Sequence, residues 1–277
     1  MNEYENKHNF ITTEIIASLP NYTEGPAVDS EGNIYCTTLT GGTILKIDIQ
    51  NKINVWAKCG CPNGQIITDG GDHLVCDVKN SAIKRFDRTG KFIRNEIAKN
   101  CAGFPFTCPN DLVTDHDGNL YFTDSVRHSG KICYVSKNGR ELILLENLDY
   151  PNGIIFSHNE EVLYVAESYK NRILKISLKT NGEVDKVNVF ANLPVHKSGK
   201  EENNLPDGLA LDYNGNIWVA HYGMKSILQL SPSGKLLRTQ EVDFPLTSNL
   251  FFADKNTLIV TGGFGEPGPG GVIKILL

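Results

Sequence analysis

The sequence predicts an all-β fold, a six-bladed β-propeller with four antiparallel strands in each blade. A two-residue signal recurs six times, and an apolar run, a polar turn and a second apolar run follow it each time. The six signals are Glu24-Gly25, Asn63-Gly64, Asn110-Asp111, Asn152-Gly153, Asp207-Gly208 and Ser248-Asn249. Their first residues are separated by 39, 47, 42, 55 and 41 residues, a spacing typical of propeller blades. The chain lacks the long helical periodicity of an α/β fold.

Each unit opens with a predicted β-hairpin. In chain order, the first four hairpins turn at Glu31-Gly32, Gly70-Gly71, Asp117-Gly118 and Ser157–Glu161. The fifth unit is the clearest, because residues 207–212 and 217–220 are apolar runs on either side of an Asn-Gly turn. Two further runs, 227–230 and 236–238, complete four strands around a Ser-Pro-Ser-Gly turn.

The last unit, from residue 248 to residue 277, has room for only three strands. Residues 10–17 form a strand-like run ahead of the first blade. We expect this N-terminal strand to close the last blade, because closure removes an exposed sheet edge. The expected organisation is therefore one propeller domain over residues 1–277.

Composition excludes several classes of function. The net charge is −5 and Lys and Arg do not cluster, so nucleic acid is not the expected partner. No apolar run reaches the ~18 residues that span a bilayer, and the N-terminus does not resemble a signal peptide. The seven cysteines are an odd number, which favours reduced thiols. We therefore expect a cytoplasmic protein, a monomer or weak homodimer, with a small-molecule substrate.

The first residues of the six signals should form an inner ring at one mouth of the central channel, because first strands line that channel. The inner ring is Glu24, Asn63, Asn110, Asn152, Asp207 and Ser248. Carboxylate and amide oxygens that converge are a cation site, and Glu24, Asn110, Asn152 and Asp207 are the predicted ligands. Any one of these residues alone is more often a turn or cap residue, but four at equivalent positions favour a metal.

The second strand of each blade returns to the same mouth and predicts a second ring. Its members are Thr38, Asp77, Asp124, Glu167, His221 and Gly262. Asp124 and His221 are candidate catalytic residues beside Asp207, and Glu167 is a candidate substrate-binding residue. A solvated carboxylate and a hydrogen-bonded structural histidine are the competing interpretations.

Two longer connections should lie over this mouth, namely residues 100–109 and 195–205. Loops on a rigid scaffold usually carry substrate selectivity. Phe104, Phe106 and Cys108, together with Asn63 and Asn110 of the inner ring, are therefore candidate substrate-binding residues. Packing of the two phenylalanines onto their own blade is the alternative.

Several motifs resemble those of the senescence marker protein/gluconolactonase/luciferin-regenerating enzyme family of six-bladed propellers. They are Glu24-Gly25-Pro26, Pro109-Asn110-Asp111-Leu112, Pro151-Asn152-Gly153, Pro206-Asp207-Gly208-Leu209-Ala210 and Ala220-His221-Tyr222-Gly223. The resemblance implies one divalent cation held by Glu24, Asn110, Asn152 and Asp207. The sugar-lactone branch has an Arg two residues before the Asn that matches Asn110. Cys108 stands there in this chain, so recognition of sugars through that Arg is not expected.

The leading hypothesis is a metal-dependent lactonase in which the cation polarises the ester carbonyl and water attacks. Calcium is favoured over zinc, magnesium and manganese. Asp207 is the preferred general base, ahead of Asp124 and His221. The alternatives are another reaction at the same metal, such as hydrolysis of a phosphoester or of a biosynthetic ring substrate, and a non-catalytic propeller that binds calcium or proteins.

Overall fold

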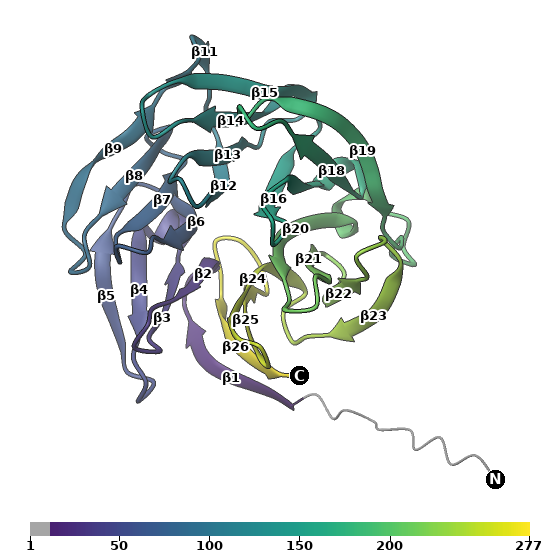
Figure 1. Ribbon diagram of the computed structural model, residues 1–277. Coiled ribbons are helices and arrows are strands. Elements are labelled where there is room, and N and C mark those ends of the chain that lie inside the picture. The colour runs from purple at the N-terminus through teal and green to yellow at the C-terminus, as the bar shows by residue number, and fades with distance from the viewer. Residues whose placement is uncertain (1–11) are drawn as a thin grey trace.

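The computed structural model, which describes residues 12–277, confirms the six-bladed propeller (Figure 1). Blade one contains β2 (Glu24–Val28), β3 (Ile34–Thr37), β4 (Thr43–Ile47) and β5 (Ile53–Lys58). Blade two contains β6 (Pro62–Ile67), β7 (His73–Asp77), β8 (Ala82–Phe86) and β9 (Phe92–Ala98). Blade three contains β12 (Pro109–Thr114), β13 (Leu120–Asp124), β14 (Gly130–Val135) and β15 (Glu141–Leu148).

The remaining blades follow the same order from the channel outward. Blade four contains β16 (Pro151–Phe156), β17 (Val162–Glu167), β18 (Arg172–Leu178) and β19 (Val184–Asn192). Blade five contains β20 (Leu205–Leu211), β21 (Ile217–Tyr222), β22 (Ser226–Leu230) and β23 (Leu236–Glu241). Blade six contains β24 (Leu246–Asp254), β25 (Thr257–Gly263), β26 (Gly270–Leu276) and the N-terminal β1 (Thr12–Leu19). Every blade therefore begins within two residues of its predicted start.

Short elements fill the connections. They are the hairpin strands β10 (Asn100–Cys101) and β11 (Phe104–Pro105), and the 3-10 helices η1 (Leu39–Gly41), η2 (Ser168–Lys170) and η3 (Glu201–Asn203). Within residues 12–277, no helix is long and apolar enough to cross a membrane.

The hairpin turns at the mouth opposite the inner ring share one arrangement in blades one, three and five. In blade one, the Asp29 carboxylate accepts hydrogen bonds from the backbone and side chain of Asn33 and from the Tyr35 hydroxyl. Gly32 takes a positive φ of 84°, which a glycine adopts without strain. Asp115 and Asp212 bind their own turns in the same way. The Asp-x-x-Gly-Asn pattern thus sets where each first strand ends.

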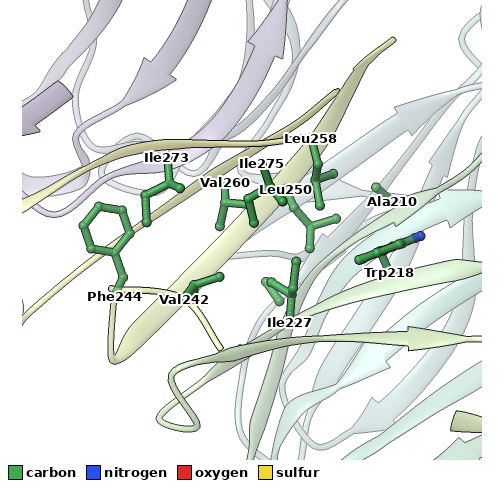
Figure 2. Close-up of a cluster of buried hydrophobic side chains, with 11 residues drawn as sticks. Ala210, Trp218, Ile227, Val242, Phe244, Leu250, Leu258, Val260, Ile273 and Ile275 are labelled. Carbon is green, nitrogen blue, oxygen red and sulfur yellow. The ribbon is translucent and has the colours of Figure 1, made fainter. Parts of the chain in front are cut away.

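The core lies between the blades. Apolar side chains of adjacent sheets form six clusters around the ring. Figure 2 shows the cluster where Trp218 and Ile227 of blade five face Leu250 and Val260 of blade six. Each cluster belongs to two blades, and the one between blades six and one forms only when the ring is closed.

The N-terminal strand closes that ring, as predicted. β1 pairs antiparallel with β26 from Thr12 to Leu19, and Ala17 and Leu19 are buried in the cluster between blades six and one. The predicted strand began at residue 10; residues 10 and 11 lie outside the described part of the chain.

Deletion of residues 1–19 should destabilise the protein, because it exposes β26 and removes Ala17 and Leu19 from a shared cluster. We expect a loss of at least about 3 kcal/mol in the free energy of unfolding, or a Tm lower by roughly 6–12 °C. A deletion of residues 1–11, which keeps every described pair, is the control. Cooperative melting of the longer deletion at the control's Tm would contradict this account of closure.

Candidate functional site

A cavity of about 190 Å³ occupies the predicted mouth of the channel. It is lined by Tyr22, Glu24, Leu39, Asn63, Asn110, Tyr150, Asn152, Ser168, Tyr169, Leu205, Asp207, Tyr222 and Glu266. Five of the six inner-ring residues are therefore brought together, each from a different blade. The sixth, Ser248, is fully buried and donates to the carbonyl oxygen of Thr23 at 2.8 Å.

A β-bulge places each inner-ring side chain. In every blade the register between the first and second strands shifts by one residue at the start, as between Glu24 and Ala27 or between Pro151 and Ile154. A bulge inserts one extra residue and re-aims the neighbouring side chains. The same irregularity occurs in all six blades, and in blades one to five the inner-ring side chain that it places lines the cavity.

In blades one, two, four and five, a glycine after the inner-ring residue permits the close approach of the strands. A Cβ at Gly25 would lie 2.5 Å from the carbonyl oxygen of Asn63, and a Cβ at Gly153 would lie 2.4 Å from that of Asp207. Such distances exclude any side chain there. The inner strands are consequently packed backbone against backbone at the mouth.

Two buried carboxylates, from blades one and five, line this cavity. Burial raises the pKa of Glu24 to about 8, with further contributions from the nearby charges of Asp111 and Glu266. Burial also raises the pKa of Asp207 well above its usual range, and the charge of Glu24 adds to the effect. Two like charges in an apolar environment are unfavourable unless protons or a cation compensate them. Positive charge in the cavity, from protons or from a cation, would therefore stabilise this pair of carboxylates.

Amide oxygens complete a donor set for a hard cation. The buried Oδ1 atoms of Asn63 and Asn152 have no hydrogen-bond partner within the described chain. The Asn152 amide lies near the Asp207 carboxylate, where it partly offsets the rise in the pKa of Asp207 that burial causes. A buried acceptor without a donor is costly, and a bound cation would satisfy it. The residues present therefore fit a divalent metal.

The carboxylates of the second ring stabilise the ends of their own blades and do not line the cavity. Asp124 accepts from the backbone N–H groups of Thr107 and Cys108 at 3.0 and 2.7 Å and lies 3.9 Å from Lys131 Nζ. Glu167 accepts from the backbone of Asp149 and from Arg172 at 2.6 Å. The structure thus separates Asp124 and Glu167 from the inner ring.

Asp77 of blade two makes the equivalent contacts. It accepts from the backbone N–H groups of Gly60 and Cys61 and pairs with Lys84 at 2.6 Å. Although burial alone raises the pKa of Asp77, hydrogen bonds from Lys84 and Asn80 hold it below its usual range. In blades two, three and four, the repeated pattern ties the loop before the first strand to the third strand.

His221 is fully buried and does not line the cavity either. Its Nε2 lies 3.0 Å from Asn171 Oδ1, and burial lowers its pKa to about 4. The imidazole is therefore neutral at physiological pH, and its partner Asn171 also donates to the carbonyl oxygens of Leu193 and Pro194. These contacts connect blades four and five.

The loop candidates also lie outside the cavity lining. Phe106 is buried and packs on Phe122 with ring centroids 5.1 Å apart, so the packing alternative describes it. Phe104 is 54% exposed in the β10–β11 hairpin. Cys108 is half-buried, and burial raises the pKa of its thiol to about 11.

Five residues that line the cavity were not predicted from the sequence, namely Tyr22, Tyr150, Tyr169, Tyr222 and Glu266. Tyr22 and Tyr150 stand two residues before Glu24 and Asn152, at the position that Cys108 occupies in blade three. Tyr222 follows His221 directly. Applying the same offsets to every blade would have found these three residues. Glu266 lies in the β25–β26 connection, where no repeat offset points to it.

Comparisons with known proteins agree with the fold. The SMP-30/Gluconolactonase/LRE-like region matches residues 22–263. Lactonase drp35 of Staphylococcus aureus (strain MW2) is 31% identical over 90% of this chain and 81% of its own length. Lactonase drp35 of Staphylococcus haemolyticus is 28% identical over 76% of this chain and 66% of its own length.

Solved structures share the architecture at lower identity. A gluconolactonase from Xanthomonas campestris superposes with a TM-score of 0.84 at 22% identity, covering 97% of this chain and 90% of that one. Regucalcin from Agrobacterium tumefaciens, described as a calcium-binding protein, has a TM-score of 0.76 at 19% identity, covering 96% and 93%. At these identities the likeness establishes the fold.

Replacement of Asp124 by Asn should lower stability and leave the chemistry intact. The variant loses the charge that pairs with Lys131 and weakens two backbone contacts, so we expect a loss of about 1–3 kcal/mol on denaturant unfolding. Asp117→Asn, at an exposed turn of the same blade, is the control. An Asp124→Asn protein of unchanged stability but with catalytic activity reduced a hundredfold would instead make Asp124 catalytic.

Proposed function

We propose that this chain, which belongs to the SMP-30/gluconolactonase/LRE-like family, is a hydrolase that opens a small lactone ring with the help of one divalent cation. The family and its lactonase relatives support a lactonase-like hydrolase. The observation that carries the proposal is the convergence of Glu24, Asp207 and three asparagines from five blades on one small cavity.

Glu24, Asn110, Asn152 and Asp207 are the proposed ligands. Two carboxylates and two amide oxygens are the mixture that calcium prefers, and calcium is our first choice over magnesium, manganese and zinc. The unpartnered Oδ1 of Asn152 and the two buried carboxylates support this assignment. When bound, the cation supplies positive charge that polarises an ester carbonyl and stabilises the oxyanion of a tetrahedral intermediate.

The protein supplies orientation and a proton acceptor. Asn63 lines the cavity beside the ligand set, and its amide, together with that of the proposed ligand Asn110, can hold the lactone. Of the three catalytic candidates Asp207, Asp124 and His221, Asp207 is the one that lines this cavity. We therefore assign Asp207 as the general base that accepts a proton from the attacking water. The tyrosine walls exclude bulk water from the ester, and ring opening then releases a hydroxy acid.

Hydrolysis of a phosphoester at the same site is the second candidate, and the charges of the cavity disfavour it. Phosphoryl groups are usually held by Arg or Lys in addition to a metal. Among the described residues that line the cavity, none is Arg, Lys or His. A purely scaffolding propeller would have no use for two buried carboxylates that line one cavity.

Lactone hydrolysis should require the cation and both carboxylates. In a panel of five- and six-membered lactones, followed by acid release, we expect turnover by the full-length protein with calcium and none with chelator. Glu24→Gln and Asp207→Asn should each lower kcat/KM by about 100-fold or more. Glu31→Gln, in an exposed turn, is the matched control. Full turnover in chelator, or in either site variant, would rule out the assignment.

The metal-free protein should lose stability as the pH rises from about 4.5 to 8. Glu24 keeps its proton in the folded state up to about pH 8, whereas the unfolded chain releases it near pH 4.5. The unfolded state therefore binds fewer protons in this window, and the free energy of unfolding falls by roughly 3–5 kcal/mol across it.

Thermal melting in chelator from pH 5 to 9 would measure this slope. Calcium should reverse it, because it binds the ionised carboxylates, and Glu24→Gln should flatten it in chelator. A Tm in chelator that stays constant from pH 5 to 8 would contradict the buried pair.

A further inference from the structure

Four tyrosines line the cavity, namely Tyr22, Tyr150, Tyr169 and Tyr222. Tyr22 and Tyr222 meet edge to face with ring centroids 6.4 Å apart, and Tyr150 and Tyr169 meet in the same way at 5.6 Å. Tyr22 is buried and the other three are half-buried, so their rings are partly open to a ligand. Aromatic faces attract apolar groups and cations alike.

Arg127 packs against the ring of Tyr169, one of the four tyrosines. Its guanidinium carbon lies 3.4 Å from the centroid of the Tyr169 ring, and its Nε donates to Asp149 Oδ1 at 2.7 Å. Glu201 of η3 approaches the same guanidinium at 3.6 Å. The charge of Arg127 is thus matched by Asp149 and Glu201, and its structural effect is to fix Tyr169.

Glu266 brings a third carboxylate to the cavity. It stands on the connection between β25 and β26, and the Tyr222 hydroxyl donates to its Oε1 at 3.0 Å. The connection is anchored one residue later, where the carbonyl oxygen of Pro267 accepts from the Tyr22 backbone N–H at 2.8 Å. Glu266 is therefore positioned between two of the tyrosines while its side chain stays exposed.

The charges of the cavity do not balance even with a cation in place. A divalent ion compensates Glu24 and Asp207 and leaves Glu266 at the rim. Across the described residues lining the cavity there is no basic side chain to neutralise it. A carboxylate that shares a cavity with several aromatic rings is an arrangement that can recognise ammonium groups. An anionic ligand would meet repulsion at the same place.

We propose that the cavity selects lactones that carry a cationic ammonium substituent, with Glu266 as its counter-charge and the four tyrosines as its aromatic cage. This inference rests on the proposed lactonase function and adds the class of substrate. Glu266 is a specificity-determining residue in this account, whereas Glu24 and Asp207 serve the metal and the chemistry.

A pair of substrates of matched shape tests the proposal. α-Trimethylammonio-γ-butyrolactone carries a fixed positive charge, and α-tert-butyl-γ-butyrolactone is its neutral counterpart. The ratio of their kcat/KM values should fall about 5–30-fold in Glu266→Gln relative to the unmodified protein. Differences in intrinsic reactivity cancel, because each protein is assayed with both substrates. Glu146→Gln, at an exposed position of β15, removes the same charge away from the cavity and should keep the ratio.

A binding measurement separates this proposal from the proposed function. Calorimetric titration of the calcium-loaded protein with tetramethylammonium, at constant ionic strength, should show binding that weakens about 5–30-fold in Glu266→Gln and is unchanged in Glu146→Gln. If no lactone is hydrolysed but this difference is found, the reaction is wrong and the cation site stands. An unchanged substrate ratio, or equal tetramethylammonium affinity in both proteins, would overturn the site.

Discussion

The close approach of the six innermost strands is the constraint on which the rest of the structure depends. At the mouth of the channel the carbonyl oxygen of Asn63 or Asp207 lies where a neighbouring blade has room only for the hydrogen of a glycine. Hydroxyl groups also bind carbonyl oxygens of this ring, since Thr37 donates to that of Asn63 and Thr123 donates to that of Asn152, both at 2.8 Å. The ring is thus joined by backbone contacts at its centre and by apolar clusters farther out.

This constraint explains why a site can exist there at all. The inner strands begin at the same level along the channel axis, and each carries a β-bulge at its start. Side chains from five blades can therefore meet in a cavity of about 190 Å³. Burying Glu24 and Asp207 together opposes folding, and the six apolar clusters between the blades offset that cost. The second ring contributes as well, because Asp77, Asp124 and Glu167 fasten the loops that enter the inner strands.

Repetition decided how much the sequence could predict. The blades, the closing strand and the inner ring follow from signals that recur at regular spacing, and so do Tyr22, Tyr150 and Tyr222 once the offsets are applied to every blade. The roles of Asp124 and His221 could not be read in the same way, because equivalent position does not tell whether a side chain faces the cavity or the backbone of its own loop. Glu266 was out of reach for a different reason, since it stands well inside the β25–β26 connection, beyond the positions at the strand ends that recur with regular spacing.

In two blades the residue after the inner-ring position is not glycine, and these two residues separate the two mouths of the channel. Blades three and six have Asp111 and Asn249 where the other blades have glycine, and a Cβ at Gly64 or Gly208 would meet these side chains. Both side chains are buried, and their Oδ1 atoms accept from the backbone N–H groups of Leu112 and Leu250 at 3.0 and 2.8 Å, so a polar layer lies directly beneath the inner ring. Beyond it, the opposite mouth holds a separate, mainly aliphatic cavity of about 270 Å³. A ligand that reaches the carboxylates must therefore enter past the tyrosines and Glu266, which places any selection among substrates at that one entrance.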